Sequence, residues 1–170
     1  MNFQEYEQKA ITTKCYSDEV AISYVTLGLC GEVGEFIEKV RNQADKELVL
    51  KELGDCLWYI AAIRIEMNLE PLNWPSVRES RPENPAELSG AIAEQIKKWL
   101  RDEWQGVGTI IPEVRKNKIH DLLSHLLGLF DDWLAETDID MTLEDVAQQN
   151  IDKLADRAKR NMIHGSGDLR

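Results

Sequence analysis

The sequence has few of the features that build β-sheets, disulfide scaffolds or membrane spans. Glycine and proline are sparse, at ten and five of 170 residues, and β-branched residues show no sustained alternation, which excludes a sandwich or barrel. The three cysteines, Cys15, Cys30 and Cys56, lack CxxC spacing, which excludes a disulfide framework or zinc knuckle and indicates a reduced compartment. Met1–Glu5 lacks the features of a signal peptide, and no apolar run approaches the roughly 20 residues of a membrane span. We therefore expect a cytoplasmic protein with no membrane partner.

Basic residues are also scarce. Lysine and arginine number 20 against 31 aspartates and glutamates, so the net charge is −11. This balance argues against nucleic acid as a partner and favours a cation. Apolar residues make up 43% of the chain, enough for one domain of this length to bury a core without staples. We expect a single folded domain over residues 1–170.

Apolar residues recur at helical spacing along the chain and predict an all-α fold. The expected helices cover residues 2–14, 17–41, 46–68, 86–104, 113–136 and 142–162. Ser17 and Asp18 offer an N-cap to the second helix, and Thr142 with Asp145 forms a capping-box-like pair before the last. Because only residues 42–45 separate the second and third helices, we expect these two to form an antiparallel hairpin within a helical bundle.

Two acidic pairs with the same spacing lie on this expected hairpin. Glu32 and Glu35 are three residues apart, as are Glu52 and Asp55, so each pair projects from one side of its helix. Antiparallel packing brings the four carboxylates to one seam, where their repulsion calls for a cation. Oxygen ligands without histidine or thiolate select a hard ion, so we expect Mg²⁺, with Mn²⁺ as the alternative. A single pair of this kind commonly lies on a solvent-exposed helix face without binding anything, but two matched pairs favour a metal site.

Glycines and a tyrosine near these acids have two interpretations each. Gly28, Gly31 and Gly34 each cost up to about 1 kcal/mol in a helix relative to alanine, so something is expected to come close to them. That neighbour is either a ligand or a tightly packed helix. Tyr59, one turn beyond Asp55, either touches a sugar or base or is an interfacial aromatic.

The last expected helix carries a basic stripe. Its members, which share one side of the helix, are Asn150, Lys153, Arg157 and Arg160. An amide and three cations suit phosphate oxygens, although a solvated face near a helix C-terminus is the alternative. The turn at Gly165–Gly167 either adds backbone N–H donors for an anion or belongs to a mobile tail.

Several of these segments resemble one known family. Gly28–Glu35, followed by Lys51–Tyr59, resembles the ExxE…ExxD signature of the MazG-like nucleoside triphosphate pyrophosphohydrolases, which belong to the all-α NTP pyrophosphatase superfamily. Asn150–Arg157 resembles the later NxxKLxxR element of that family, and Gly165–Asp168 resembles the ending of one subgroup.

The resemblance implies Mg²⁺-dependent hydrolysis of a nucleoside triphosphate to the monophosphate and pyrophosphate, in nucleotide-pool control or house-cleaning. The residues it implies as metal ligands and catalytic groups are Glu32, Glu35, Glu52 and Asp55. Those it places at the nucleotide are Asn150, Lys153 and Arg157. It also implies a homodimer or homotetramer with sites near subunit contacts.

The chain departs from the family pattern in two places. Residues 71–141, which begin with four of the five prolines between positions 71 and 85, separate two elements that adjoin in compact members, so they are expected to be a helical insertion. Some relatives carry an acidic residue directly before the first ExxE, where this chain has Gly31. Glu38, one turn beyond Glu35, or metal-bound hydroxide itself would then activate the attacking water.

A different class of function is also compatible with the charge. An acidic helical protein that binds a basic partner, in the manner of a nucleic-acid mimic, would have the same composition. Mimicry needs acids spread over a surface, whereas here two matched pairs flank core faces and a basic stripe accompanies them. This arrangement favours the enzyme.

Overall fold

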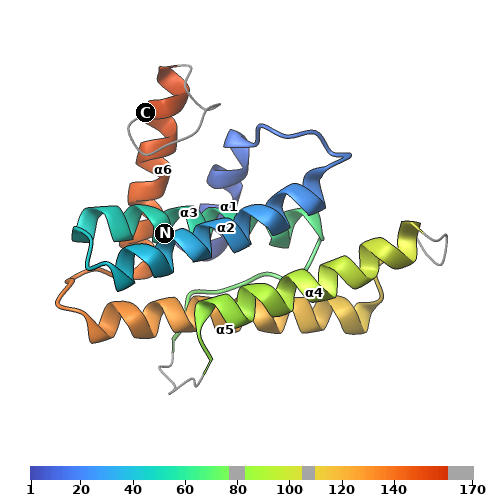
Figure 1. Cartoon of the computed structure of the whole chain (residues 1–170). Helices are drawn as coiled ribbons and strands as arrows, with labels where there is room; N and C mark the ends of the chain where they lie inside the picture. The colour runs from blue at the N-terminus through green and yellow to red at the C-terminus, as the bar shows by residue number, and fades with distance from the viewer. Residues whose placement is uncertain (77–82, 105–109, 161–170) are drawn as a thin grey trace.

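A computed structural model describes residues 1–76, 83–104 and 110–160, and all regular structure in these ranges is helical (Figure 1). The elements are α1 (Phe3–Ala10), the short 3-10 helix η1 (Ile11–Thr13), α2 (Ala21–Arg41), α3 (Lys46–Glu66), α4 (Pro85–Trp104), α5 (Glu113–Glu136) and α6 (Leu143–Lys159). The prediction of an all-α fold is confirmed. Along these ranges, no helix has both the length and the apolar character that crossing a membrane requires.

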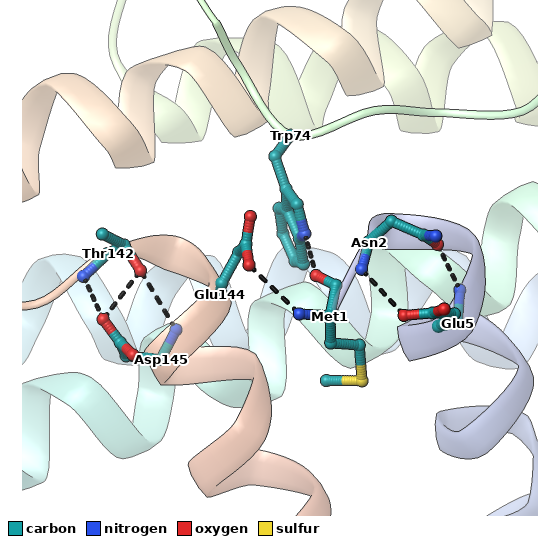
Figure 2. A network of polar contacts seen from close by, with 7 residues as sticks. All are labelled: Met1, Asn2, Glu5, Trp74, Thr142, Glu144 and Asp145. Carbon is teal, nitrogen blue, oxygen red and sulfur yellow. Dashed lines mark hydrogen bonds and ion pairs between the residues drawn. The ribbon is translucent and has the colours of Figure 1, made fainter.

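The starts of two helices test the predicted caps. At α6 the capping box is confirmed, because the Asp145 amide donates to Thr142 Oγ1 at 3.3 Å and the Thr142 amide donates to Asp145 Oδ2 at 2.9 Å (Figure 2). The predicted cap at Ser17 and Asp18 is wrong, since α2 begins at Ala21 with no side-chain cap. The Asp18 carboxylate is instead paired with the ammonium group of Lys14 at 2.5 Å, so it does not reach the helix amides.

The helices α2 and α3 are joined by four residues and share the most extensive contact between any two elements of the described chain. Their contacts run in opposite directions, since Gly28 meets Tyr59 whereas Lys39 faces Glu52. The helix α3 also contacts α1, α5 and α6, so it is covered on several sides. Acidic residues on α3 are therefore held at the edge of a packed core.

Helices α4 and α5, which come from the predicted insertion at residues 71–141, lie side by side against the α2–α3 pair (Figure 1). The Phe36 ring on α2 packs edge-on against Phe130 and Trp133 on α5, with ring centroids 5.3 and 5.0 Å apart. One buried apolar cluster includes residues from all six α-helices. The additional helices therefore share the core of the hairpin.

The starts of α1 and α6 are held next to each other by polar contacts (Figure 2). The Trp74 indole N–H donates to the carbonyl of Met1 at 2.8 Å, and the Met1 ammonium donates to Glu144 Oε2 at 3.1 Å. A capping box between Asn2 and Glu5 begins α1. These contacts fix α1 against α6, and both helices also pack on α3. Side chains of α6, one of them bonded to α1, reach an acidic residue of α3 that is described below.

Candidate functional site

Three carboxylates meet at the seam between α2 and α3. Glu32, Glu52 and Asp55 each offer one oxygen, and these oxygens lie within 4.8 Å of one another. Glu52 is only 3% exposed, and Glu32 and Asp55 are half-buried. Three carboxylates without nitrogen or sulfur donors are the ligands that hard cations such as Mg²⁺ and Mn²⁺ prefer. The residues present therefore fit such an ion.

The electrostatics of the seam act on Glu32. Burial, followed by the negative charges of Asp55, Glu35 and Glu52, raises the pKa of Glu32 from 4.5 to about 8. The ammonium group of Lys153 acts in the opposite direction. In the absence of a cation, Glu32 therefore holds a proton at neutral pH, and a bound cation would displace it.

Glu35 and Glu38, which were also predicted at this site, are both exposed on α2 and lie outside the group of three carboxylates. Glu35 lies about 60° further around the helix than Glu32, which turns it toward solvent. Its charge is still close enough to raise the pKa of Glu32. The ligand role of Glu35 and the water-activating role of Glu38 stay predictions.

Two residues of the predicted basic stripe reach the carboxylates. Asn150 Nδ2 donates to Asp55 Oδ1 at 3.1 Å, and Lys153 Nζ contacts the same oxygen at 2.5 Å. The approach of α6 depends on Gly54, because a Cβ there would lie 3.2 Å from both Cβ and Nδ2 of Asn150. Gly54 stands between the two acids of its motif, and this small residue was the available signal for close helix packing.

The other two residues of the stripe lie differently. Arg157 is half-buried, and its Nε is buried without a hydrogen bond to any described residue. Arg160 is more exposed and pairs with Asp156 Oδ2 at 2.6 Å. The turn at Gly165–Gly167 and the resemblance over Gly165–Asp168 lie outside the described residues.

A small cavity of about 130 Å³ lies between α3 and α6, beside these contacts. It is lined by Leu50, Lys51, Gly54, Val146, Gln149, Asn150 and Lys153. Two of the lining side chains are cationic and two carry amides. The hollow next to Asp55 is therefore suited to an anionic group.

The two interpretations of the glycines separate by position. At Gly28 a Cβ would lie 2.1 Å from Cε1 of Tyr59, so the aromatic ring fills the space and tight packing is the correct interpretation there. At Gly31 and Gly34 a Cβ would meet no described atom within 4 Å. The Tyr59 ring also packs 6.3 Å from the ring of Tyr24, centroid to centroid. Contact of Tyr59 with a nucleotide stays a prediction.

This difference gives opposite expectations for two alanine substitutions in α2. Gly28→Ala should lower the melting temperature, because the new methyl group overlaps the Tyr59 ring and displaces it. Gly31→Ala should raise the stability by up to about 1 kcal/mol, because the methyl group enters open space and alanine favours the helix. Thermal unfolding of both variants checks this. Equal shifts of the same sign would contradict the packing of Tyr59 on Gly28.

One polar residue at the site was missed by the sequence analysis. The Tyr6 hydroxyl on α1 donates to Asn150 Oδ1 at 3.0 Å in a buried contact. Tyr6 lies 144 residues from Asn150 in the sequence, and no spacing pattern connects the two helices.

Comparison with known proteins identifies the α2–α3 segment. Residues 22–68 match the family model of the MazG nucleotide pyrophosphohydrolase domain. Gene 37 protein of Mycobacterium phage L5 is 34% identical over 58 residues, a segment that covers 28% of this chain and 51% of the phage protein. The match thus spans about half the length of that relative. No solved structure matches the chain. The resemblance to MazG-like proteins is confirmed over the segment that carries all four predicted carboxylates.

Proposed function

We propose that this chain, whose residues 22–68 are MazG-like, hydrolyses a nucleoside triphosphate to the monophosphate and pyrophosphate with Mg²⁺. The observation that carries the proposal is the meeting of Glu32, Glu52 and Asp55 at the α2–α3 seam, inside the matched segment. Sequence similarity alone gives the type of domain. The three carboxylates add a site that could hold the metal ion on which this hydrolysis would depend.

We assign cation binding and proton transfer in this reaction to different residues of the chain. Glu32, Glu52 and Asp55 would hold the cation, with Glu35 as a further ligand, and Glu32 would lose its proton on binding. The bound ion would neutralise phosphate charge and lower the pKa of a water molecule. The oxygen of the attacking water would bond to the α-phosphorus while the bond between the α-phosphorus and the α,β-bridging oxygen breaks. The electron pair of the broken bond would stay on the bridging oxygen and leave with pyrophosphate. The proton of the water passes to Glu38 or to solvent.

The residues of α6 would bind the phosphates. Lys153 is already at the carboxylates, and with Lys51 it lines the cavity between α3 and α6. Arg157 has a buried Nε with no hydrogen-bond partner among the described residues, so a phosphate oxygen would give it one. We also place Arg160 and Tyr59 at the nucleotide, as the extension of this stripe and of the α3 face. Charge on the leaving pyrophosphate would be stabilised by these cations.

The proposal requires one pair of products. Incubation with Mg²⁺ and a panel of ribo- and deoxynucleoside triphosphates, canonical and modified, should give monophosphate and pyrophosphate in equal amounts from at least one of them. The products are separated by ion-exchange chromatography, with a matched reaction in excess chelator as the control. Nucleoside diphosphate and orthophosphate as the primary products would contradict attack at the α-phosphorus.

The burial of the acids favours the enzyme over the acidic nucleic-acid mimic. A mimic presents its carboxylates to a partner, whereas Glu52 is 3% exposed and Glu32 is half-buried. We further propose a homodimer or homotetramer on the strength of the family resemblance. Sedimentation velocity of the purified chain tests that assembly.

A further inference from the structure

A chain of two hydrogen bonds leads from the buried Tyr6 on α1 to the carboxylates. The Tyr6 hydroxyl donates to Asn150 Oδ1 at 3.0 Å, and Asn150 Nδ2 donates to Asp55 Oδ1 at 3.1 Å. Tyr6 is 0% exposed and Asn150 is 3% exposed, so water does not compete for the contact between these two side chains. Three helices that are distant in the sequence therefore meet through one side-chain amide.

The chemistry of the two ends fixes the direction of this chain. An ionised carboxylate only accepts hydrogen bonds, so the amide of Asn150 must turn its NH₂ group toward Asp55. Its oxygen then faces Tyr6, which must donate. Burial raises the pKa of the Tyr6 hydroxyl, so it keeps the proton that this donation needs. A reversed amide would leave two acceptors facing each other at Asp55.

Tyr6 is itself held in place by its surroundings. Its ring lies 5.9 Å from that of Phe3 and 6.0 Å from that of Trp74, centroid to centroid. The indole of Trp74 in turn donates to the Met1 carbonyl, within the contacts that join the starts of α1 and α6 (Figure 2). The hydroxyl of Tyr6 is thus presented to Asn150 by a rigid aromatic cluster.

We propose that Tyr6 is a positioning residue of the cation site, which acts through the amide of Asn150 on Asp55. The inference rests on the proposed function, since it takes Asp55 as a ligand of the cation. Asn150 and Lys153 both contact Oδ1 of Asp55, while Oδ2 accepts no hydrogen bond from the described residues. Fixing the amide holds the carboxylate in an orientation that leaves Oδ2 for the ion. Partners one step behind the ligands tune metal affinity in this way.

Tyr6→Phe tests the inference because it keeps the ring and removes only the hydroxyl. Mn²⁺ alone is titrated into the protein by calorimetry, and the variant should bind it about tenfold more weakly. Tyr16→Phe is the matched control, since it removes a hydroxyl that donates to Glu66 Oε1 at 2.9 Å. Glu66 is not one of the three carboxylates of the cation site. Its Mn²⁺ affinity should equal that of the unmodified chain.

A double-mutant cycle separates positioning through Asn150 from a general loss of structure. Asn150→Ala should weaken Mn²⁺ binding, and adding Tyr6→Phe to it should cause no further loss. An unchanged Kd in Tyr6→Phe, or an equal loss with and without Asn150, would overturn the inference. The Mn²⁺ titrations contain no nucleotide, so their result does not depend on hydrolysis. If the chain binds Mn²⁺ but hydrolyses no triphosphate, the proposed function is wrong, and the cycle still decides the role of Tyr6. A chain that binds no Mn²⁺ overturns both.

Discussion

Glu32→Gln should abolish nearly all hydrolysis and most Mg²⁺-induced stabilisation, while making the metal-free protein more stable. The glutamine keeps the size of the side chain and removes a carboxylate that the seam disfavours in its charged form. In the presence of Mg²⁺ the unmodified chain should gain about 2.7 kcal/mol at a hundredfold excess over the dissociation constant. The variant lacks one of three carboxylates at the seam and should lose most of this gain.

The metal-free part of this prediction depends on pH. The folded pKa of Glu32, about 8, lies above the ordinary value of 4.5, so the folded chain binds the extra proton between these values. Its stability therefore falls as pH rises through that window, because ionisation is easier in the unfolded chain. Glutamine has no such dependence. The advantage of Glu32→Gln should be small near pH 4.5 and greatest from pH 8 upward.

Thermal unfolding at pH 5 and pH 8, with and without Mg²⁺, checks both parts. Glu47→Gln makes the same chemical change at an exposed position in the first turn of α3 and should leave the Mg²⁺ shift intact. If Glu32→Gln destabilises the metal-free protein and keeps the Mg²⁺ shift, Glu32 is an ordinary structural partner. Glu35→Gln in the same series measures how far the exposed acid contributes to cation binding.

The sequence was sufficient to predict the main helices because each has an apolar side that must be buried. The helix at 113–136 has the bounds that its periodicity predicted, and the last helix begins at its predicted cap. The start of α2 differs because Lys14 pairs with Asp18, an interaction that local cap rules do not consider. Periodicity thus predicts which residues share a side of a helix. The first and last residues of a helix also depend on whether the side chains that could cap it are paired elsewhere.

The candidate site was predictable to the extent that helix geometry determines it. The matched spacing on two helices joined by a short link placed Glu32, Glu52 and Asp55 together. Helical projection showed that Asn150 and Lys153 share a stripe, but it did not show which helix that stripe contacts. That information comes from packing, in which Gly54 admits Asn150. Tyr6 was missed for the same reason, since its partner belongs to a distant helix.

Lys153→Ala should change turnover and cation binding in different ways. Loss of a charged donor beside the reacting phosphate should lower kcat/KM for the triphosphate by about 100-fold. The ammonium group also lies 2.5 Å from Asp55 Oδ1, where it repels an incoming cation. Without it, Mn²⁺ alone should bind at least as tightly as before, because Asn150 still contacts the same oxygen.

Steady-state kinetics and Mn²⁺ calorimetry on this one variant separate the two roles of the lysine. Lys159→Ala, an exposed position in the last turn of the same helix, is the matched control and should leave both quantities unchanged. Unchanged kcat/KM in Lys153→Ala would mean that this lysine has no part in catalysis. Equal losses of Mn²⁺ affinity and turnover would mean that Lys153 acts only by holding Asp55. Lower turnover with retained Mn²⁺ affinity is the result expected of a group that binds the phosphates.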